Sequence, residues 1–183
     1  MPKGTSYIQP AQKSSWETPK DLFDALWEEA DGFDCDPCCT PEQYTARRIM
    51  EHGTPVANGL DYKGVICIPP PGDGMEYHID VPLRERVLID GLAQPWHGKV
   101  FMNPPYGLAL RKWVPRAVEM VKTGAAESVW ALLPAKTDTQ WFQAHVVPRL
   151  LEAPGEVRFL KGRLTFGGAP DPAGFASVVV VWR

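Results

Sequence analysis

The amino-acid sequence predicts an α/β fold: one mostly parallel sheet with helices on both faces. Apolar runs typical of buried strands alternate with segments whose apolar residues recur at helical spacing. Two of the runs are closely followed by prolines, Pro104 and Pro134, and then by a predicted helix. Because 183 residues suffice for one continuous core, the pattern indicates a single domain.

Two segments fall outside this regular pattern. Residues 1–15 are polar, with glycine, serine and glutamine between two lysines, and we expect a flexible arm that precedes a single domain at 16–183. Residues 52–86 are rich in proline and glycine and contain one short strand-like run at 64–68. We interpret residues 52–86 as an insertion, which is either a functional lid or an ordinary surface excursion.

Composition excludes several classes of protein. No apolar run approaches the roughly 18 residues of a membrane span, and the first residues do not form a signal peptide. We therefore expect a cytoplasmic protein with no membrane partner, whose four cysteines are unpaired thiols. With a formal net charge of −3, any nucleic acid would have to bind through a local basic patch.

The chain is organised around Asn103-Pro104-Pro105-Tyr106, which follows the apolar run 99–102. That run predicts a buried strand, so the motif lies at a strand's carboxyl end, where open α/β sheets bind ligands. The two prolines stiffen a loop that presents the Asn103 amide oxygen, the Pro104 carbonyl and the Tyr106 ring. These groups suit a planar substrate with an exocyclic amine. The alternative is a simple proline turn.

Asn-Pro-Pro-Tyr resembles the catalytic motif of amino-group methyltransferases that use S-adenosylmethionine, chiefly the DNA N6-adenine enzymes. The resemblance implies that Asn103 and the Pro104 carbonyl accept the two amine hydrogens, so that the localised nitrogen lone pair attacks the sulfonium methyl in line. Pro105 and Tyr106 complete this catalytic set, and Tyr106 stacks on the base. No metal and no strong base is needed.

Trp16-Glu17-Thr18-Pro19 precedes a predicted amphipathic helix that continues to Ala30. From the pattern alone, Thr18 is the N-cap, Pro19 lies in the first turn, and Trp16 belongs to the core. The segment also resembles a Thr-Pro that adenine methyltransferases carry just before a helix. That likeness implies that Trp16, Thr18 and Pro19 contact the methionine end of the cofactor.

Asp36-Pro37-Cys38 follows a short predicted strand and resembles the acidic start of the family's cofactor loop. The likeness implies that these three residues bind the cofactor and that Asp36 holds its ammonium group by a charge-assisted bond. Cys39 stands where the family has glycine, which allows closer approach of the backbone. Cys35 and Cys38 also suggest zinc, but no second pair at finger-like spacing follows, and we expect no metal.

Asp90-Gly91 is first a turn signal ahead of the central strand. An aspartate shortly before Asn-Pro-Pro-Tyr also resembles the family residue that accepts the N6 amine of the cofactor's adenine. The likeness therefore places Asp90 and Gly91 at the end of the cofactor opposite Asp36.

The second half of the chain supplies the candidate contacts to nucleic acid. It predicts a helix at 108–121 and strands at 128–133, 157–160 and 176–182. Residues 161–168 combine cations, an aromatic ring and two glycines, a composition typical of a loop that grips phosphate and stacks on bases. The alternative is an ordinary hairpin with solvated charges. The candidate residues are Lys112, Lys136, Lys161, Arg163 and Phe166.

Taken in order from Trp16 to Trp182, these motifs resemble the small phage-type Dam-like DNA N6-adenine methyltransferases. The resemblance implies a Rossmann-like methyltransferase domain that uses S-adenosylmethionine, double-stranded DNA as partner, and the host cytoplasm for a phage-encoded protein. A domain of this length has no room for a separate target-recognition domain, so loops would choose the site and the adenine would be flipped out. Two alternatives remain: methylation of RNA or a protein glutamine, and a catalytically silent nucleic-acid-binding module.

Overall fold

The computed structural model describes residues 17–38, 45, 56–57, 66–67, 91–93 and 96–183. Most of the predicted insertion at 52–86 lies outside the described residues, as do Trp16 and Asp90. Within the insertion, β1 (Val56–Ala57) and β2 (Ile66–Cys67) form an antiparallel pair. No helix in the described parts of the chain is both long enough and apolar enough to cross a membrane.

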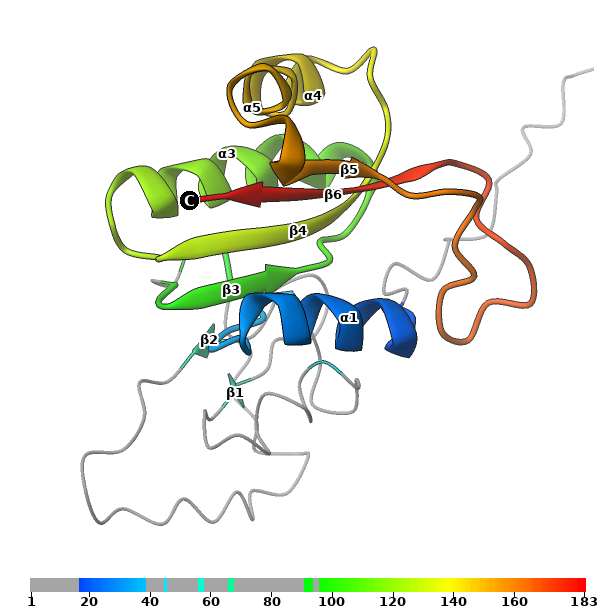
Figure 1. Cartoon of the computed structure of the whole chain (residues 1–183), viewed down its shortest axis with the longest axis horizontal. Coiled ribbons are helices and arrows are strands. Elements are labelled where there is room, and N and C mark those ends of the chain that lie inside the picture. Colours follow the sequence, from blue (N-terminus) through cyan, green and yellow to red (C-terminus); the bar gives the residue numbers. More distant parts are fainter. Residues whose placement is uncertain (1–16, 39–44, 46–55, 58–65, 68–90, 94–95) are drawn as a thin grey trace, which may run out of the picture.

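The central sheet contains β3 (Lys99–Met102), β4 (Ser128–Pro134), β6 (Ser177–Trp182) and β5 (Val157–Phe159), in that spatial order. β3 and β4 are parallel, whereas β6 is antiparallel to both β4 and β5. β5 therefore runs in the direction of β3 and β4 (Figure 1). The sheet is mixed, and the expectation of a mostly parallel sheet is wrong, because the reversed β6 lies between two strands of the common direction.

A short segment before β3 extends this sheet. Cys35 forms a parallel bridge with Val100, and the backbone N–H of Phe101 donates to the Cys35 carbonyl at 2.8 Å. The backbone N–H of Asp34 donates in turn to the Lys99 carbonyl at 2.8 Å. Asp36 and Asn103 are therefore the first residues after two adjacent, parallel segments, which end at Cys35 and Met102.

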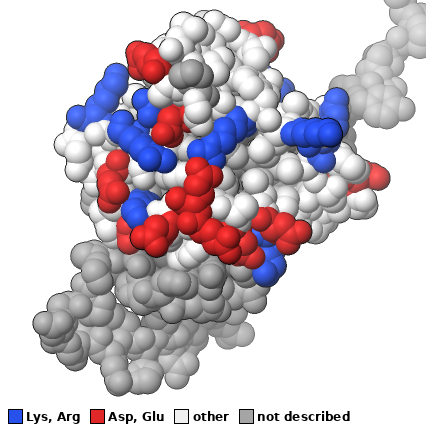
Figure 2. All heavy atoms as spheres, in the orientation of Figure 1, with Lys and Arg blue, Asp and Glu red and all other residues white. Residues whose placement is uncertain are grey.

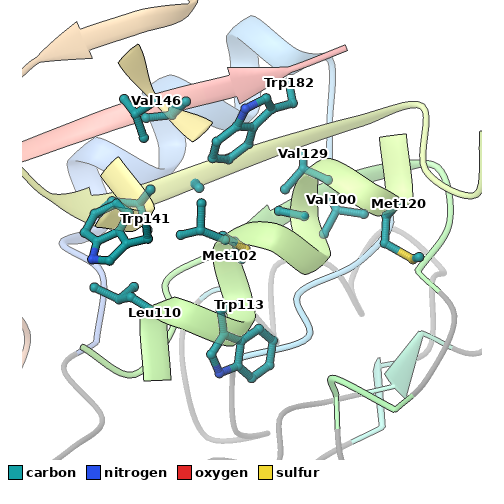
Figure 3. Close-up of a cluster of buried hydrophobic side chains, with 14 of the residues drawn as sticks. Val100, Met102, Leu110, Trp113, Met120, Val129, Trp141, Val146 and Trp182 are labelled. Atoms are coloured by element: carbon teal, nitrogen blue, oxygen red, sulfur yellow. The ribbon is translucent and has the colours of Figure 1, made fainter. Parts of the chain in front are cut away.

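Every residue of β4 and β6 is buried, which explains their nearly continuous apolar sequences. Alternate side chains enter two cores, with Val129 and Ala131 in one and Trp130 and Leu132 in the other. The first core is covered by α3 (Leu110–Lys122), α4 (Gln140–His145) and α5 (Val147–Glu152) (Figures 1 and 3). The second is covered by α1 (Lys20–Ala30). Helices on both faces are thus confirmed.

The residues at which the helices begin determine where the loops of the candidate site end. α1 has Pro19 at its N-cap position and no side-chain cap, so the prediction that Thr18 caps it is wrong. A short 3-10 turn, η2 (Gly107–Ala109), links the end of the central motif to α3, which continues through Pro115. A second 3-10 turn, η3 (Pro154–Glu156), precedes β5.

Candidate active site

The candidate site lies where the carboxyl ends of the parallel segments meet. Asn103 follows Met102 at the end of β3, and Asp36 follows the paired Cys35. Pro134 ends β4 and Phe159 ends β5 at nearly the same level, because their partners Ser177 and Val178 are neighbours on β6. In Figure 1 the start of α1 and the loop between β5 and β6 lie at this same edge. Loops from widely separated parts of the chain therefore converge there.

Asn103 is held by a side-chain hydrogen bond from the first part of the chain. Its Nδ2 donates to Oγ1 of Thr18 at 3.1 Å. Thr18 is only 4% exposed, and Pro104 and Pro105 are buried behind the half-buried Asn103. The hydrogen bond from Nδ2 to Thr18 fixes the plane of the Asn103 side-chain amide. It thereby also fixes the position of the acceptor atom Oδ1, which lies in the same plane.

The loop at 36–38 contacts Asn103 from another direction. Asp36 is 2% exposed, and its Oδ1 accepts the Cys38 backbone N–H at 3.0 Å. Burial, followed by the charge of Asp36, raises the pKa of the Cys38 thiol well above its ordinary value, while a hydrogen bond from the Asn103 backbone opposes the rise. Pro37, which lies between Asp36 and Cys38 in the sequence, is also buried. The predicted cofactor loop and the predicted catalytic loop are therefore in direct contact.

Tyr106 is fixed by two phenylalanines and one hydrogen bond. Its ring meets Phe175 and Phe166 edge-on, with centroids at 5.4 and 6.0 Å. Its hydroxyl donates to the Leu132 carbonyl of β4 at 3.4 Å. Burial, with a smaller contribution from Cys38, raises the pKa of Tyr106 far above its ordinary value, so the phenol stays neutral.

Phe166 does not present its ring to solvent, because it is 1% exposed and packs in the core beside α1. Its loop is tied to the chain ahead of α1 by the Gly167 N–H, which donates to the Glu17 carbonyl at 2.8 Å. Base stacking by Phe166 stays a prediction; in this structure its buried ring packs against Tyr106. Lys161 and Arg163 on the same loop are exposed.

The other predicted cofactor residues occupy different surroundings. Pro19 is half-buried at the start of α1. Gly91 is buried, and its carbonyl accepts the Trp96 indole N–H at 2.8 Å, while the Trp96 ring stacks on Trp113 of α3. Gly91 is thus attached to the core under α3. Among the described residues, no contact joins Gly91 to Thr18, Cys38, Asn103 or Tyr106, which together form the Asn103 cluster.

The predicted cations all follow carboxyl ends of strands. Lys112 lies on α3 after β3, Lys136 follows β4, and Lys161 and Arg163 follow β5, each with an exposed side chain. The Arg163 guanidinium also donates to the Ala173 carbonyl at 3.3 Å. Figure 2 shows basic and acidic side chains intermixed on one face, without a single continuous basic surface there. On this face, phosphate contacts would therefore come from individual cations.

A cavity of about 240 Å³ lies at the opposite edge of the sheet. Its wall includes Trp182, which pairs with Val129 near the amino end of β4, together with Lys122 and His145. Burial, followed by the charge of Lys122, lowers the pKa of His145. This cavity is separate from the Asn103 cluster.

Cysteine chemistry differs from the prediction at one position. Cys35 is disulfide-bonded, so the expectation that all four cysteines are free thiols is wrong for this residue. Spacing along the chain does not reveal which sulfur atoms meet after folding. Within the described ranges, no group of three or more histidine, cysteine, aspartate or glutamate side chains is placed to hold a metal ion.

Sequence patterns missed three contacts of the site: Thr18 with Asn103, Cys38 with Asn103, and Phe175 with Tyr106. Each joins residues at least 65 positions apart in the printed sequence. No local periodicity or spacing signals such pairs.

A family model described as DNA N-6-adenine-methyltransferase (Dam) matches residues 87–180, which is just over half of the chain. The matched range contains the Asn103–Tyr106 motif and the four predicted cations, whereas Thr18 and Asp36 precede it. No curated protein and no solved structure matches the chain.

Proposed function

This chain belongs to the DNA N-6-adenine-methyltransferase (Dam) family, and we propose that it methylates the N6 amine of adenine in double-stranded DNA with S-adenosylmethionine as donor. Adenine N6 methylation of DNA is the activity of the family. The observation that carries the finer proposal is the oriented amide of Asn103 at the carboxyl end of β3. The donor, the double-stranded substrate and the Asn-Pro-Pro-Tyr pocket are parts of this proposal.

In the proposed reaction, Asn103 Oδ1 and the Pro104 carbonyl each accept one hydrogen of the adenine amine. These bonds draw the nitrogen lone pair out of conjugation with the ring, and they strengthen as the nitrogen becomes tetrahedral. S-adenosylmethionine, when bound, supplies a methyl group on a positively charged sulfur. The amine nitrogen forms the new N–C bond, the C–S bond breaks with its electron pair going to sulfur, and the nitrogen releases one proton to water.

The donor set at the 36–38 loop fits an ammonium-bearing cofactor. Asp36 is a buried carboxylate that accepts the Cys38 backbone N–H, and Cys38 in turn contacts Asn103. Asp36 can therefore accept a charge-assisted hydrogen bond on the loop that contacts Asn103. We propose that Pro37 and Cys38 line this end of the cofactor. Trp16, Thr18 and Pro19 would lie beside its methionine part, with Asp90 and Gly91 at its adenine.

For DNA, we propose that the target adenine is flipped out of the duplex and stacks on Tyr106. The exposed cations Lys112, Lys136, Lys161 and Arg163 would contact phosphates. We also infer that residues 16–183 form one Rossmann-like methyltransferase domain that includes the insertion at 52–86. We propose that loops of this domain contribute to the choice of the site.

The test is methyl transfer by the full chain from labelled S-adenosylmethionine to plasmid DNA, with the modified nucleoside identified by mass spectrometry. We expect N6-methyladenine from the wild-type protein. Asn103→Ala should lower the single-turnover rate by orders of magnitude while cofactor affinity, measured by calorimetry, stays nearly unchanged. Parallel reactions with RNA and with a glutamine-containing protein examine the other acceptors.

Three results would contradict the proposal. Label in RNA or protein but not in DNA would assign a different acceptor. Cofactor binding without any transfer would indicate a silent binding module. An Asn103→Ala variant that methylates DNA at the wild-type rate would reduce Asn-Pro-Pro-Tyr to a structural turn.

A further inference from the structure

Leu108 is a large apolar side chain held in solvent beside the candidate site. It is 77% exposed on η2, two residues after Tyr106. Among the described residues, the exposed large hydrophobic side chains are Leu108, Leu151 and Phe159. Single exposed leucines are common on protein surfaces, so exposure alone says little. Leu108 is separated from the Asn103–Tyr106 motif by one residue, whereas Leu151 lies on α5 and Phe159 ends β5.

The segment around Leu108 has open space before it in the sequence, at Gly107, and a buried residue after it, Leu110. Gly107 has φ of +88°, and a Cβ atom added to it would meet no heavy atom within 4 Å. On the other side, Leu110 is fully buried in the core as the first residue of α3. The exposed leucine therefore projects from a turn whose following residue is anchored.

Two cations follow within one helical turn of this leucine. Arg111 and Lys112 are both exposed on the first turn of α3. An apolar tip next to positive charge is the combination with which proteins enter a base stack, since the tip contacts bases while the cations contact phosphates.

We propose that Leu108 inserts into the DNA base stack and fills the space that the target adenine leaves when it turns toward Asn103. This inference rests on the proposed function, because it requires a flipped adenine. Tyr106 and Leu108 are two residues apart, so a single loop would carry both the stacking face for the flipped base and the side chain that fills its vacated position. Filling the gap stabilises the flipped state, whose formation otherwise costs free energy because stacking and pairing are lost.

The test compares the full-length wild-type protein with Leu108→Ala, Leu108→Met and Leu151→Ala. Leu151 is also 77% exposed but lies on α5, so it is the matched control. Each protein is given two duplexes that contain the adenine site identified in plasmid DNA methylated by the wild type. In one duplex the target adenine is paired with thymine, and in the other it lies opposite an abasic site, where flipping costs least.

We expect Leu108→Ala to methylate the paired duplex at least about tenfold more slowly than the wild type, since the flipped state loses its filler. On the abasic duplex the two rates should agree within about twofold, because little pairing energy must be overcome. Leu108→Met keeps an apolar chain and should retain most of the activity, and Leu151→Ala should match the wild type on both duplexes. With 2-aminopurine at the target position, Leu108→Ala should give a smaller rise in fluorescence than the wild type.

Different outcomes separate this inference from the proposed function. If the wild type methylates both duplexes and Leu108→Ala does so equally fast, the wedge role is wrong while the proposed function stands. If Leu108→Ala is slowed equally on both duplexes, Leu108 positions the catalytic loop and does not fill the stack. If the wild type methylates neither duplex, the proposed function fails and the wedge role fails with it.

Discussion

The Asn103 side-chain amide donates to Oγ1 of Thr18 at 3.1 Å, across 85 positions of sequence. Thr18 lies just before α1, and Asn103 follows β3, so the bond joins the start of the described chain to the central motif. The likeness to the family had suggested a cofactor contact for Thr18. The structure adds a second role, which is to orient the amide that we propose reacts with the base.

Replacing Thr18 with valine should slow catalysis more than it weakens cofactor binding. Valine keeps the branched shape in this buried position but removes the acceptor, which leaves Nδ2 of Asn103 without its hydroxyl partner and costs about 1–3 kcal/mol. We expect a single-turnover rate about tenfold or more below wild type, with the cofactor dissociation constant changed by less than about threefold. Thr18→Ser restores the hydroxyl and should recover the rate. Equal rates for the serine and valine variants would show that the hydroxyl does not orient Asn103.

Substitutions at Tyr106 should separate the ring from the hydroxyl. The hydrogen bond to the Leu132 carbonyl is long at 3.4 Å, so Tyr106→Phe should keep most of the activity. Tyr106→Ala removes the stacking face, and binding of a flipped base should weaken by about 1–3 kcal/mol. It also removes the edge-on contacts with Phe166 and Phe175, so thermal unfolding should occur at lower temperature. A flipped base that binds Tyr106→Ala as tightly as wild type would exclude the stacking role.

Asp36→Asn tests the proposed ammonium contact without removing the loop's own hydrogen bond. Asparagine keeps an Oδ1 acceptor for the Cys38 backbone N–H, but it loses the negative charge and has an NH2 donor in place of the second carboxylate oxygen. Loss of a charge-assisted bond should weaken cofactor binding by about 1.5–3 kcal/mol, or roughly 10- to 150-fold in the dissociation constant. Calorimetry with S-adenosylmethionine measures the change. Unaltered affinity would place the ammonium elsewhere.

The pKa of Cys38 predicts a pH dependence of its reactivity. Burial, and then the Asp36 carboxylate, raise this pKa, so the thiol stays protonated at pH 8 and should react with iodoacetamide more slowly than glutathione. Asp36→Asn removes the second cause and should accelerate alkylation. Because the folded protein keeps the proton to higher pH than the unfolded chain, this thiol's contribution to stability is complete below the ordinary cysteine pKa and declines as the pH rises above it. Fragment mass spectra locate the label, and fast alkylation of Cys38 at pH 8 would contradict the prediction.

The sequence predicted the parts of the fold whose evidence is local. A continuous apolar run identified β4, and Asn103 was placed correctly after a strand because a run and a proline are adjacent in the sequence. The direction of β6 was not predictable in this way, since an apolar strand reads the same in either orientation. Phe166 was assigned to the surface because its neighbours are cations and glycines, whereas its burial depends on Tyr106 and α1, which are distant in sequence.

Lys161 and Arg163 should supply part of the salt dependence of DNA binding. The chain carries a net charge of −3, so its affinity for DNA depends on the few cations that reach phosphates, and these two are exposed on the loop that leaves β5. Each neutralised phosphate contributes about −0.9 to the slope of log K against log salt concentration. Replacing both residues with glutamine should therefore make the slope less negative by about 1.8. Titrations of labelled duplex at several salt concentrations give this slope.

The control for this measurement is Lys122→Gln. Lys122 ends α3 beside the cavity at the opposite edge of the sheet, so its removal changes the net charge by one without touching the loop. An unchanged slope for Lys122→Gln, together with a flatter slope for the double variant, would locate the phosphates at the loop. If both variants flatten the slope in proportion to the charge removed, the effect belongs to the overall charge and not to the loop. If the double variant keeps the wild-type slope, Lys161 and Arg163 do not contact the DNA backbone.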